Sequence, residues 1–262
     1  TWYYLLIDCI LIGVAAGLIY GIFGSGSGLI MTPGFYYVLR HFEVAQAQEM
    51  QIAIATTAFT SAVLGAFAAN VQWRSHYIDF QAVKKIFPGI AIGTLLAIGL
   101  LNVIPSSFLK RLFGVVVVAV AFWLWFYRQD RDSRSWSLDS ISNYWLTGVM
   151  GLVWFLLGVA VFIMPYLHKN GLDIRHSVGC AALTSAVFSG LAAILLMITG
   201  LFRIGIAEGH VGFVNMPLVL ISVVPSACAA YFGSRISHRL PQIHLKKIYA
   251  GLILLVGILM LI

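Results

Sequence analysis

The chain alternates between long uncharged apolar stretches and short polar breaks that carry its charge. All sixteen Lys and Arg residues, and every acidic residue except Asp8, lie in the breaks. A charge at the centre of a bilayer is costly, whereas a charge in a flanking loop is tolerated. The pattern therefore predicts an all-α polytopic membrane protein, with helices in the uncharged runs 50–73, 86–109, 112–127, 143–168, 176–202, 209–234 and 248–262.

A membrane-spanning helix needs about 20 residues at about 1.5 Å of rise per residue. Six segments meet that length, and the predicted spans are 50–70, 84–103, 109–127, 177–200, 212–233 and 245–262. Two further segments, 5–39 and 144–167, are interrupted by glycine. Each is expected to form a broken helical hairpin that re-enters the membrane, with a single full span as the alternative for 144–167.

Four landmarks recur in the same order in the two halves of the chain. They are Gly26 with Pro33 and Gly158 with Pro165, Ala55–Ala58 and Leu183–Ala186, Tyr77–Phe80 and Phe213–Met216, and Pro105 and Pro241. Such self-similarity is typical of a duplication. We therefore expect one membrane domain, residues 1–262, made of repeats 1–127 and 144–262 that are joined by the polar loop 128–143.

The distribution of basic residues favours inverted repeats, each made of one hairpin and three spans. In that topology the loops 70–85, 128–142, 168–176 and 233–247 share one side and hold twelve of the Lys and Arg residues, against four on the other side. A parallel duplication would divide them nine to seven. Because basic loops stay in the cytoplasm, the twelve-base side is expected to be cytoplasmic, with both termini outside.

Composition removes several other classes of protein. Charged residues make up 10% and hydrophobic ones 61%, against about 25% and 45–50% in soluble domains, so no soluble appendage is expected. The net charge of +7 is scattered among loops, which argues against nucleic-acid binding. The three cysteines, Cys9, Cys180 and Cys228, lie in apolar segments and argue against a disulfide or a metal site.

The chemistry of the remaining polar residues argues against an enzyme. All seven histidines fall in predicted loops, which disfavours a membrane haem and a serine hydrolase built on Ser27. Asp8 is the one carboxylate in an apolar run; we expect it near an interface, and a proton relay is disfavoured. No Walker motif is present, so the chain is not itself an ATP-driven pump, and no cofactor is expected.

The first glycine segment is a candidate anion site. It contains the five consecutive residues Gly24, Ser25, Gly26, Ser27 and Gly28, a composition that forms a helix poorly. Glycine lets the backbone approach a ligand, and a helix restarting at Gly28 would offer free amide groups and the positive end of its dipole. The alternative is close helix packing, which we favour for Gly13 and Gly17.

Hydroxyl residues in both halves are the next candidates for the site. Thr56, Thr57 and Ser61 in the first half correspond to Thr184, Ser185 and Ser189 in the second, and residues four apart share a helix face. These hydroxyls would line the anion site or bond the carbonyl groups of their own helices. Asp79 and Asn215 begin equivalent spans and are expected to be N-terminal caps. The predicted structural or hinge positions are Pro33, Gly158 and Pro165.

These motifs, in this order, resemble the TauE/SafE family of sulfite and organosulfonate exporters. The likeness covers both repeats and is carried by Gly17-x3-Gly21-x2-Gly24-x-Gly26-x-Gly28-x4-Pro33, Ala55-Thr56-Thr57, Pro105-x3-Leu109-Lys110, Ala182-Leu183-Thr184-Ser185 and Leu240-Pro241-x3-Leu245-Lys246. The resemblance implies a transporter that moves sulfite, sulfoacetate or a related anion outward. The second half has Gly158-Val159-Ala160, so only the first glycine loop is intact and the site is expected there.

The resulting hypothesis is a secondary transporter in a bacterial or archaeal cytoplasmic membrane that exports a small sulfur oxyanion by alternating access. Its partners would be the lipid bilayer and a small anion, and a homodimer is left open. An inside-negative potential favours anion exit by about 2.3 kcal/mol per charge per 100 mV, whereas uptake would need a coupled cation. The alternatives are an anion or small-solute channel, an uptake permease for sulfur compounds, a membrane enzyme or assembly factor, and a scaffold subunit.

Overall fold

The structure, a computed structural model, describes residues 2–41, 48–126, 141–157, 162–203, 206–207, 209–237 and 242–261. The first half of the chain forms helices α1 (Trp2–Phe23), α2 (Gly28–His41), α3 (Glu49–Arg74), α4 (Phe80–Leu101) and α5 (Ser106–Phe126). The second half forms helices α6 (Ile141–Leu157), α7 (Ile163–Lys169), α8 (Ile174–Leu201), α9 (Met216–Ser237) and α10 (Gln242–Leu261), with strands β1 (Ile206–Ala207), β2 (His210–Val211) and β3 (Val214–Asn215).

The all-α membrane architecture expected from the charge pattern is confirmed. Within the described residues, six helices are long and apolar enough to cross a membrane, namely α1, α3, α4, α5, α8 and α9. All six predicted spans form helices, as α3, α4, α5, α8, α9 and α10. Their apolar side chains are dictated by the lipid, and their backbone groups are satisfied inside each helix, as the bilayer requires.

The prediction was wrong just before α9. The predicted span 212–233 begins four residues too early, because residues 206–207, 210–211 and 214–215 form a small antiparallel sheet in the order β1-β2-β3. Gly209 and Gly212 have φ values of 88° and 58°, a backbone conformation that glycine adopts readily and that tight turns between strands require. Apolar composition alone could not separate these short strands from the helix that follows them.

The placement of the histidines was also wrong in part. His210 lies in strand β2. His41, His168, His176 and His244 lie inside α2, α7, α8 and α10 rather than in loops. Each is close to the end of its helix, because these helices continue for a turn beyond the apolar core of the segment.

Both predicted N-terminal caps are confirmed. The Asp79 carboxylate accepts hydrogen bonds from the amide groups of Gln81 at 2.8 Å and Ala82 at 3.2 Å, at the start of α4. The Asn215 side-chain oxygen accepts one from the amide group of Leu218 at 3.0 Å, at the start of α9. Each cap satisfies amide groups that a helix leaves unpaired in its first turn.

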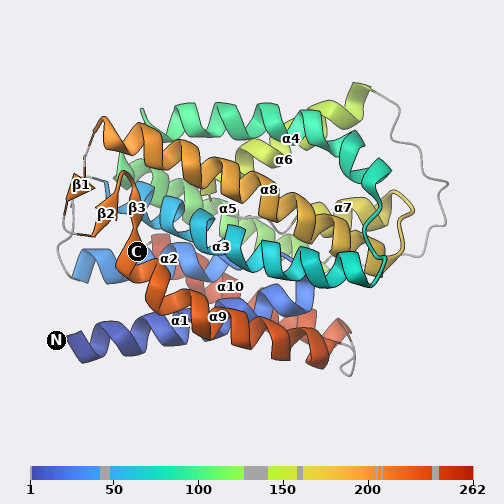
Figure 1. Cartoon of the computed structure of the whole chain (residues 1–262), viewed down its shortest axis with the longest axis horizontal. Coiled ribbons are helices and arrows are strands. Elements are labelled where there is room, and N and C mark those ends of the chain that lie inside the picture. The colour runs from blue at the N-terminus through green and yellow to red at the C-terminus, as the bar shows by residue number, and fades with distance from the viewer. Residues whose placement is uncertain are drawn as a thin grey trace.

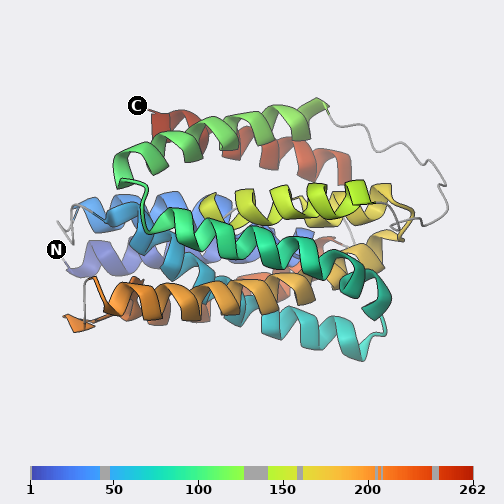
Figure 2. The same ribbon diagram turned by 90° about the horizontal axis from the view of Figure 1, so that it is seen from above.

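The helices run along one common direction, so the turns gather at two ends of the bundle (Figure 1). The N-terminus, the C-terminus and the β1–β3 sheet lie at one end, and the α3–α4 and α7–α8 turns lie at the other. α6 starts and α7 finishes at that second end, so this pair enters and leaves on the same side (Figures 1 and 2).

In neither glycine-interrupted segment do two helices of half-membrane length form the expected re-entrant hairpin. α6 has 17 residues and α7 has 7, rather than two halves of similar length. α1 has 22 residues and is long enough to span by itself, so it is not a half-helix. Gly158 lies outside the described residues.

The helices pair in a reciprocal pattern between the two halves. α1 packs against α9, and α6, the corresponding first helix of the second half, packs against α4. The two remaining large contacts join equivalent helices, α3 with α8 and α5 with α10. Figure 2 shows α5 beside α10 and α4 beside α6. Each half therefore completes the other, and most of the tertiary packing is between halves.

Glycine permits the closest of these approaches. A Cβ added at Gly17 would overlap the Ser226 backbone of α9, and one added at Gly93 would overlap the Gly148 carbonyl group of α6. Small residues at helix contacts are the usual way in which membrane helices gain van der Waals packing. The packing interpretation of Gly17 therefore agrees with the structure.

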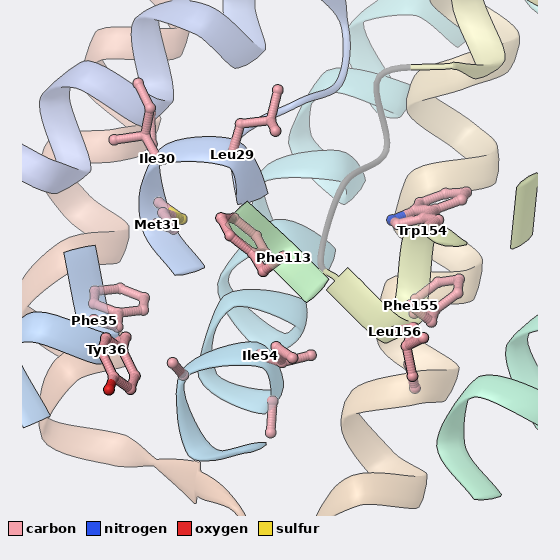
Figure 3. Packing of buried hydrophobic residues seen from close by; sticks show 14 of the residues in the cluster. Leu29, Ile30, Met31, Phe35, Tyr36, Ile54, Phe113, Trp154, Phe155 and Leu156 are labelled. Atoms are coloured by element: carbon pink, nitrogen blue, oxygen red, sulfur yellow. The ribbon is translucent and has the colours of Figure 1, made fainter. Parts of the chain in front are cut away.

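Buried apolar side chains of α2, α3, α5 and α6 belong to one hydrophobic core, part of which Figure 3 shows. On α6 the Trp154 and Phe155 rings stack with their centroids 4.7 Å apart. The side chains labelled in Figure 3 are Leu29, Ile30, Met31, Phe35, Tyr36, Ile54, Phe113, Trp154, Phe155 and Leu156. This packing fixes the position of α2 and therefore of the glycine loop at its start.

The hairpin formed by α6 and α7 can be tested by labelling single cysteines with a membrane-impermeant maleimide. Cysteines at Ser75, Asn143 and His168 are expected to react from the same side of the membrane, and one at Asn102 from the opposite side. Cys9 and Cys180 are buried but Cys228 is exposed, so each single cysteine is introduced into a Cys228→Ser protein, and that protein gives the background. Reaction of Asn143→Cys and His168→Cys from opposite sides would mean that α6 and α7 together span the membrane.

The close contact of α1 with α9 predicts the effect of two glycine substitutions. Gly17→Ala should destabilise the protein by about 1–3 kcal/mol, because the new Cβ meets the Ser226 backbone. Gly99→Ala in α4 is the matched control: its Cβ would meet nothing within 4 Å, and alanine favours a helix by about 1 kcal/mol over glycine. Thermal unfolding in detergent should show a lower midpoint for Gly17→Ala alone, and equal midpoints would contradict the packing argument.

Candidate functional site

The predicted ligand loop is a tight break between α1 and α2. Gly24 and Gly26 have φ values of 70° and 95°, which side chains rarely tolerate, and the Gly24 amide group closes α1 by donating to the Tyr20 carbonyl at 2.8 Å. All five residues from Gly24 to Gly28 are buried. The loop therefore lies inside the protein rather than on its surface.

α2 restarts directly after the loop and directs its N-terminal end into the interior. Leu29 is the first residue of α2 whose amide group joins the helix ladder, donating to the Gly26 carbonyl at 3.2 Å. The Ser27 and Gly28 amide groups precede that ladder, where a helix leaves donors without an intrahelical partner. Such an end attracts anions through its amide groups and its dipole.

Two pairs of buried hydroxyls join α2 to α3. The Ser27 and Ser61 oxygens are 2.9 Å apart, and the Thr32 hydroxyl donates to the Thr57 oxygen at 3.3 Å. The structure thus brings together Ser27, Thr57 and Ser61, three residues that the sequence singled out in two separate segments. Thr32 was not among the candidates, because a threonine inside an apolar run carries no signal of its own.

A tyrosine that the sequence analysis missed completes this cluster. Tyr20 lies one turn before Gly24 and is 1% exposed, and its hydroxyl has no hydrogen-bond partner among the residues that the structure describes. Ser185 of α8 lies close enough for its side chain to interact with that hydroxyl. In the sequence, Tyr20 looks like a packing residue; its place one turn before the glycine break is the signal that would have found it.

Thr56 and Thr184, predicted as counterparts, make different contacts. The Thr56 hydroxyl oxygen accepts a hydrogen bond from the Asn215 amide group at 3.1 Å, so it links α3 to the start of α9. The Thr184 hydroxyl donates to the Cys180 carbonyl of its own helix at 2.7 Å. For Thr184 the structure therefore agrees with the packing alternative.

Cys180 performs in the second half a linking role like that of Thr56 in the first. Its sulfur accepts a hydrogen bond from the Asp79 amide group at 3.3 Å, and the thiol lies 3.5 Å from the Asp79 carbonyl as a weak donor. The starts of α4 and α9 are thus each held by a polar side chain of the opposite half.

The remaining positions that the sequence singled out are the two prolines and Asp8. Pro33 is inside α2 and supplies no amide hydrogen, whereas Pro165 is in the first turn of α7, where the missing donor costs little. A hinge role for either stays a prediction. Asp8 is exposed on α1 and lines an open cavity of about 570 Å³ with Arg40 and His41.

His210 extends the contact between Thr56 and Asn215 toward the β1–β3 end of the bundle. The Asn215 side-chain amide lies 3.1 Å from His210 Nε2 and donates to it when the ring is neutral. His210 is 7% exposed, and its Nδ1 has no partner within the described part of the chain. Burial lowers the pKa of this imidazole, because the charged form loses its hydration.

Comparison with known proteins assigns the chain to a class of transporters. The family model described as sulfite exporter TauE/SafE matches residues 9–260. A probable membrane transporter protein of Haemophilus influenzae is 25% identical over 95% of this chain and 96% of its own length. One of Methanocaldococcus jannaschii is 24% identical over 96% and 94%, and one of Bacillus subtilis 27% identical over 94% and 98%. No solved structure matches the chain.

The lowered pKa of His210 predicts how stability depends on pH. The unfolded chain takes up a proton near pH 6.5, whereas the folded ring takes it up only at lower pH, so this contribution to stability is lost as the pH falls below about 6.5. His210→Gln keeps a hydrogen-bond acceptor for Asn215 but cannot titrate. Between pH 7.5 and 5.5, the unfolding midpoint should fall further in the wild type than in His210→Gln. Equal losses would contradict the prediction.

Proposed function

The chain belongs to the sulfite exporter TauE/SafE family, and on that basis we propose that it exports a small sulfur oxyanion such as sulfite or an organosulfonate. It is an integral membrane transporter rather than an enzyme, since its family and its relatives are membrane transporters. The anion, the direction of transport and the mechanism below are our proposal.

The observation that carries the proposal is the buried glycine loop with its hydroxyl pairs. The start of α2 and the hydroxyls of Ser27, Ser61, Thr32 and Thr57 supply hydrogen-bond donors in the interior. Sulfite and sulfonate oxygens are strong acceptors whose charge is spread over several atoms. Donors of this kind would bind such an anion without a buried cation, and a site of moderate affinity releases its substrate.

For the transport cycle, we propose alternating access between two inverted repeats, residues 1–127 and 144–262, within a single domain. Two observations support this: the reciprocal packing of α1 with α9 and of α6 with α4, and the return of α6 and α7 to the end where they start. Movement of one half against the other would expose the loop to each side in turn. Broken helices at the interface between repeats are a common design for such sites.

The direction follows from electrostatics in this proposal. The end of the bundle with the twelve-base loops would face the cytoplasm, and both termini would lie outside. An inside-negative potential then drives the anion outward, by about 2.3 kcal/mol per charge per 100 mV. Export would need no coupling ion.

The proposal can be tested by measuring radiolabelled sulfite flux in proteoliposomes, with and without an imposed membrane potential. Wild-type flux should saturate with concentration, respond to the potential and increase with sulfite on the opposite side. Ser27→Leu should reduce it at least tenfold, because it removes a donor and fills the loop. Ser75→Leu, at the exposed turn after α3, is the matched control and should transport normally.

Each contrary result has a distinct meaning. Flux that does not saturate would replace the carrier with a channel. Flux that is unchanged in a folded Ser27→Leu variant would move the site away from the glycine loop. Absence of flux in folded wild-type protein would reject sulfite as the substrate.

A further inference from the structure

The Tyr20 hydroxyl is a polar group that the packing of the protein does not explain. It is on a side chain that is 1% exposed, and no hydrogen-bond partner lies among the residues described. Buried hydroxyls are almost always bonded, because leaving one unbonded forfeits its hydration with no return. An exception beside a candidate site points to a ligand rather than to packing.

The hydroxyl continues a row that runs along one face of α3. Thr57, Ser61 and Gly65 are each four residues apart, which is about one helical turn and about 6 Å along the axis. Thr57 meets Thr32 of α2, and Ser61 meets Ser27 of the loop just before α2. At the third position α3 has no side chain, and the Tyr20 hydroxyl lies there instead.

Gly65 makes that position available. A Cβ added to Gly65 would lie 2.9 Å from the Tyr20 hydroxyl oxygen and 2.8 Å from the Ala186 Cα of α8. The phenol therefore reaches the line of contact between α3 and α8, which belong to different halves. Ser185 is the neighbour of Ala186 on α8, so a hydroxyl residue of the second half belongs to the same junction, although no hydrogen bond joins it to the phenol in the structure.

The hydroxyls along this row differ in how many of their hydrogen bonds are already made. Ser27 and Ser61 are bonded to each other, and so are Thr32 and Thr57, so part of their hydrogen-bonding capacity is already used. The Tyr20 O–H keeps its donor. A phenol donates well to an anionic oxygen, and such charge-assisted bonds are stronger than neutral ones.

We propose that Tyr20 is a substrate-binding residue whose hydroxyl donates a hydrogen bond to an oxygen of the transported anion, at the junction of α1, α3 and α8. The ligand class is a small oxyanion with several equivalent oxygens, so that one oxygen meets Tyr20 while another meets Ser27. This rests on the proposed function. It adds a contact that only the assembled halves provide, since Tyr20 and Gly65 come from the first half and Ser185 from the second.

The test is Tyr20→Phe, which removes a single oxygen and keeps the ring. The KM for sulfite flux in proteoliposomes should rise about 10- to 100-fold, as for loss of a hydrogen bond to a charged group. The unfolding midpoint without substrate should stay the same or rise, because an unbonded buried hydroxyl has been removed. Tyr166→Phe on α7 is the matched control: that hydroxyl is also buried with no partner in the described residues, and its KM should not change.

A structural role would give the opposite result: a lower midpoint with an unchanged KM in Tyr20→Phe would overturn the proposal. Thermal stabilisation by sulfite, sulfoacetate, sulfate and phosphate provides a readout that is independent of flux. Stabilisation of the wild type that is lost in Tyr20→Phe supports the inference even when sulfite is not transported. If the anions stabilise the wild type and Tyr20→Phe equally, the role of Tyr20 is overturned but the oxyanion site is not. If they stabilise neither protein, both the role of Tyr20 and the oxyanion site are overturned.

Discussion

Polar groups inside a bilayer must find their partners within the protein, and that requirement explains much of this structure. There is no water in the hydrocarbon core to hydrogen-bond a stray donor, so helices satisfy their own backbones and hydroxyls bond to one another or to a carbonyl. α3 shows both solutions: Thr60 bonds the carbonyl group of Thr56, and Ser61 bonds the hydroxyl of Ser27. The rest of the bundle packs around these contacts.

The same requirement gives the glycine loop its chemical character. A buried Lys or Arg would hold an anion tightly and would be costly when the site is empty. The break between α1 and α2 instead exposes backbone donors, which carry no net charge, beside hydroxyls that already have partners. Gly24 and Gly26 make this break, because their left-handed conformations would strain any other residue. In the proposed function, this interior would be polar enough to solvate an anion and neutral enough to release it.

The two halves repeat the architecture but not every contact. Asn215 bonds the Thr56 hydroxyl and Asp79 bonds the Cys180 thiol, so both halves anchor the start of one helix on the other half with different atoms. Thr184 turns to its own helix, and no second glycine loop like Gly24–Gly28 is present in the sequence. The two halves thus carry one intact glycine loop between them, and the contacts between halves determine how the hydroxyls around it are placed.

The sequence by itself determined the spans, the caps at Asp79 and Asn215, the break at Gly24–Gly28 and the family, because lipid and helix ends restrict which residues stand at such positions. Only the tertiary structure decided which hydroxyls meet. Helical periodicity says that Thr57 and Ser61 share a face, but the partner of that face depends on how α2, α3 and α8 cross. The pairs Ser27–Ser61 and Thr32–Thr57 and the unbonded hydroxyl of Tyr20 all depend on those crossings, which no local pattern encodes.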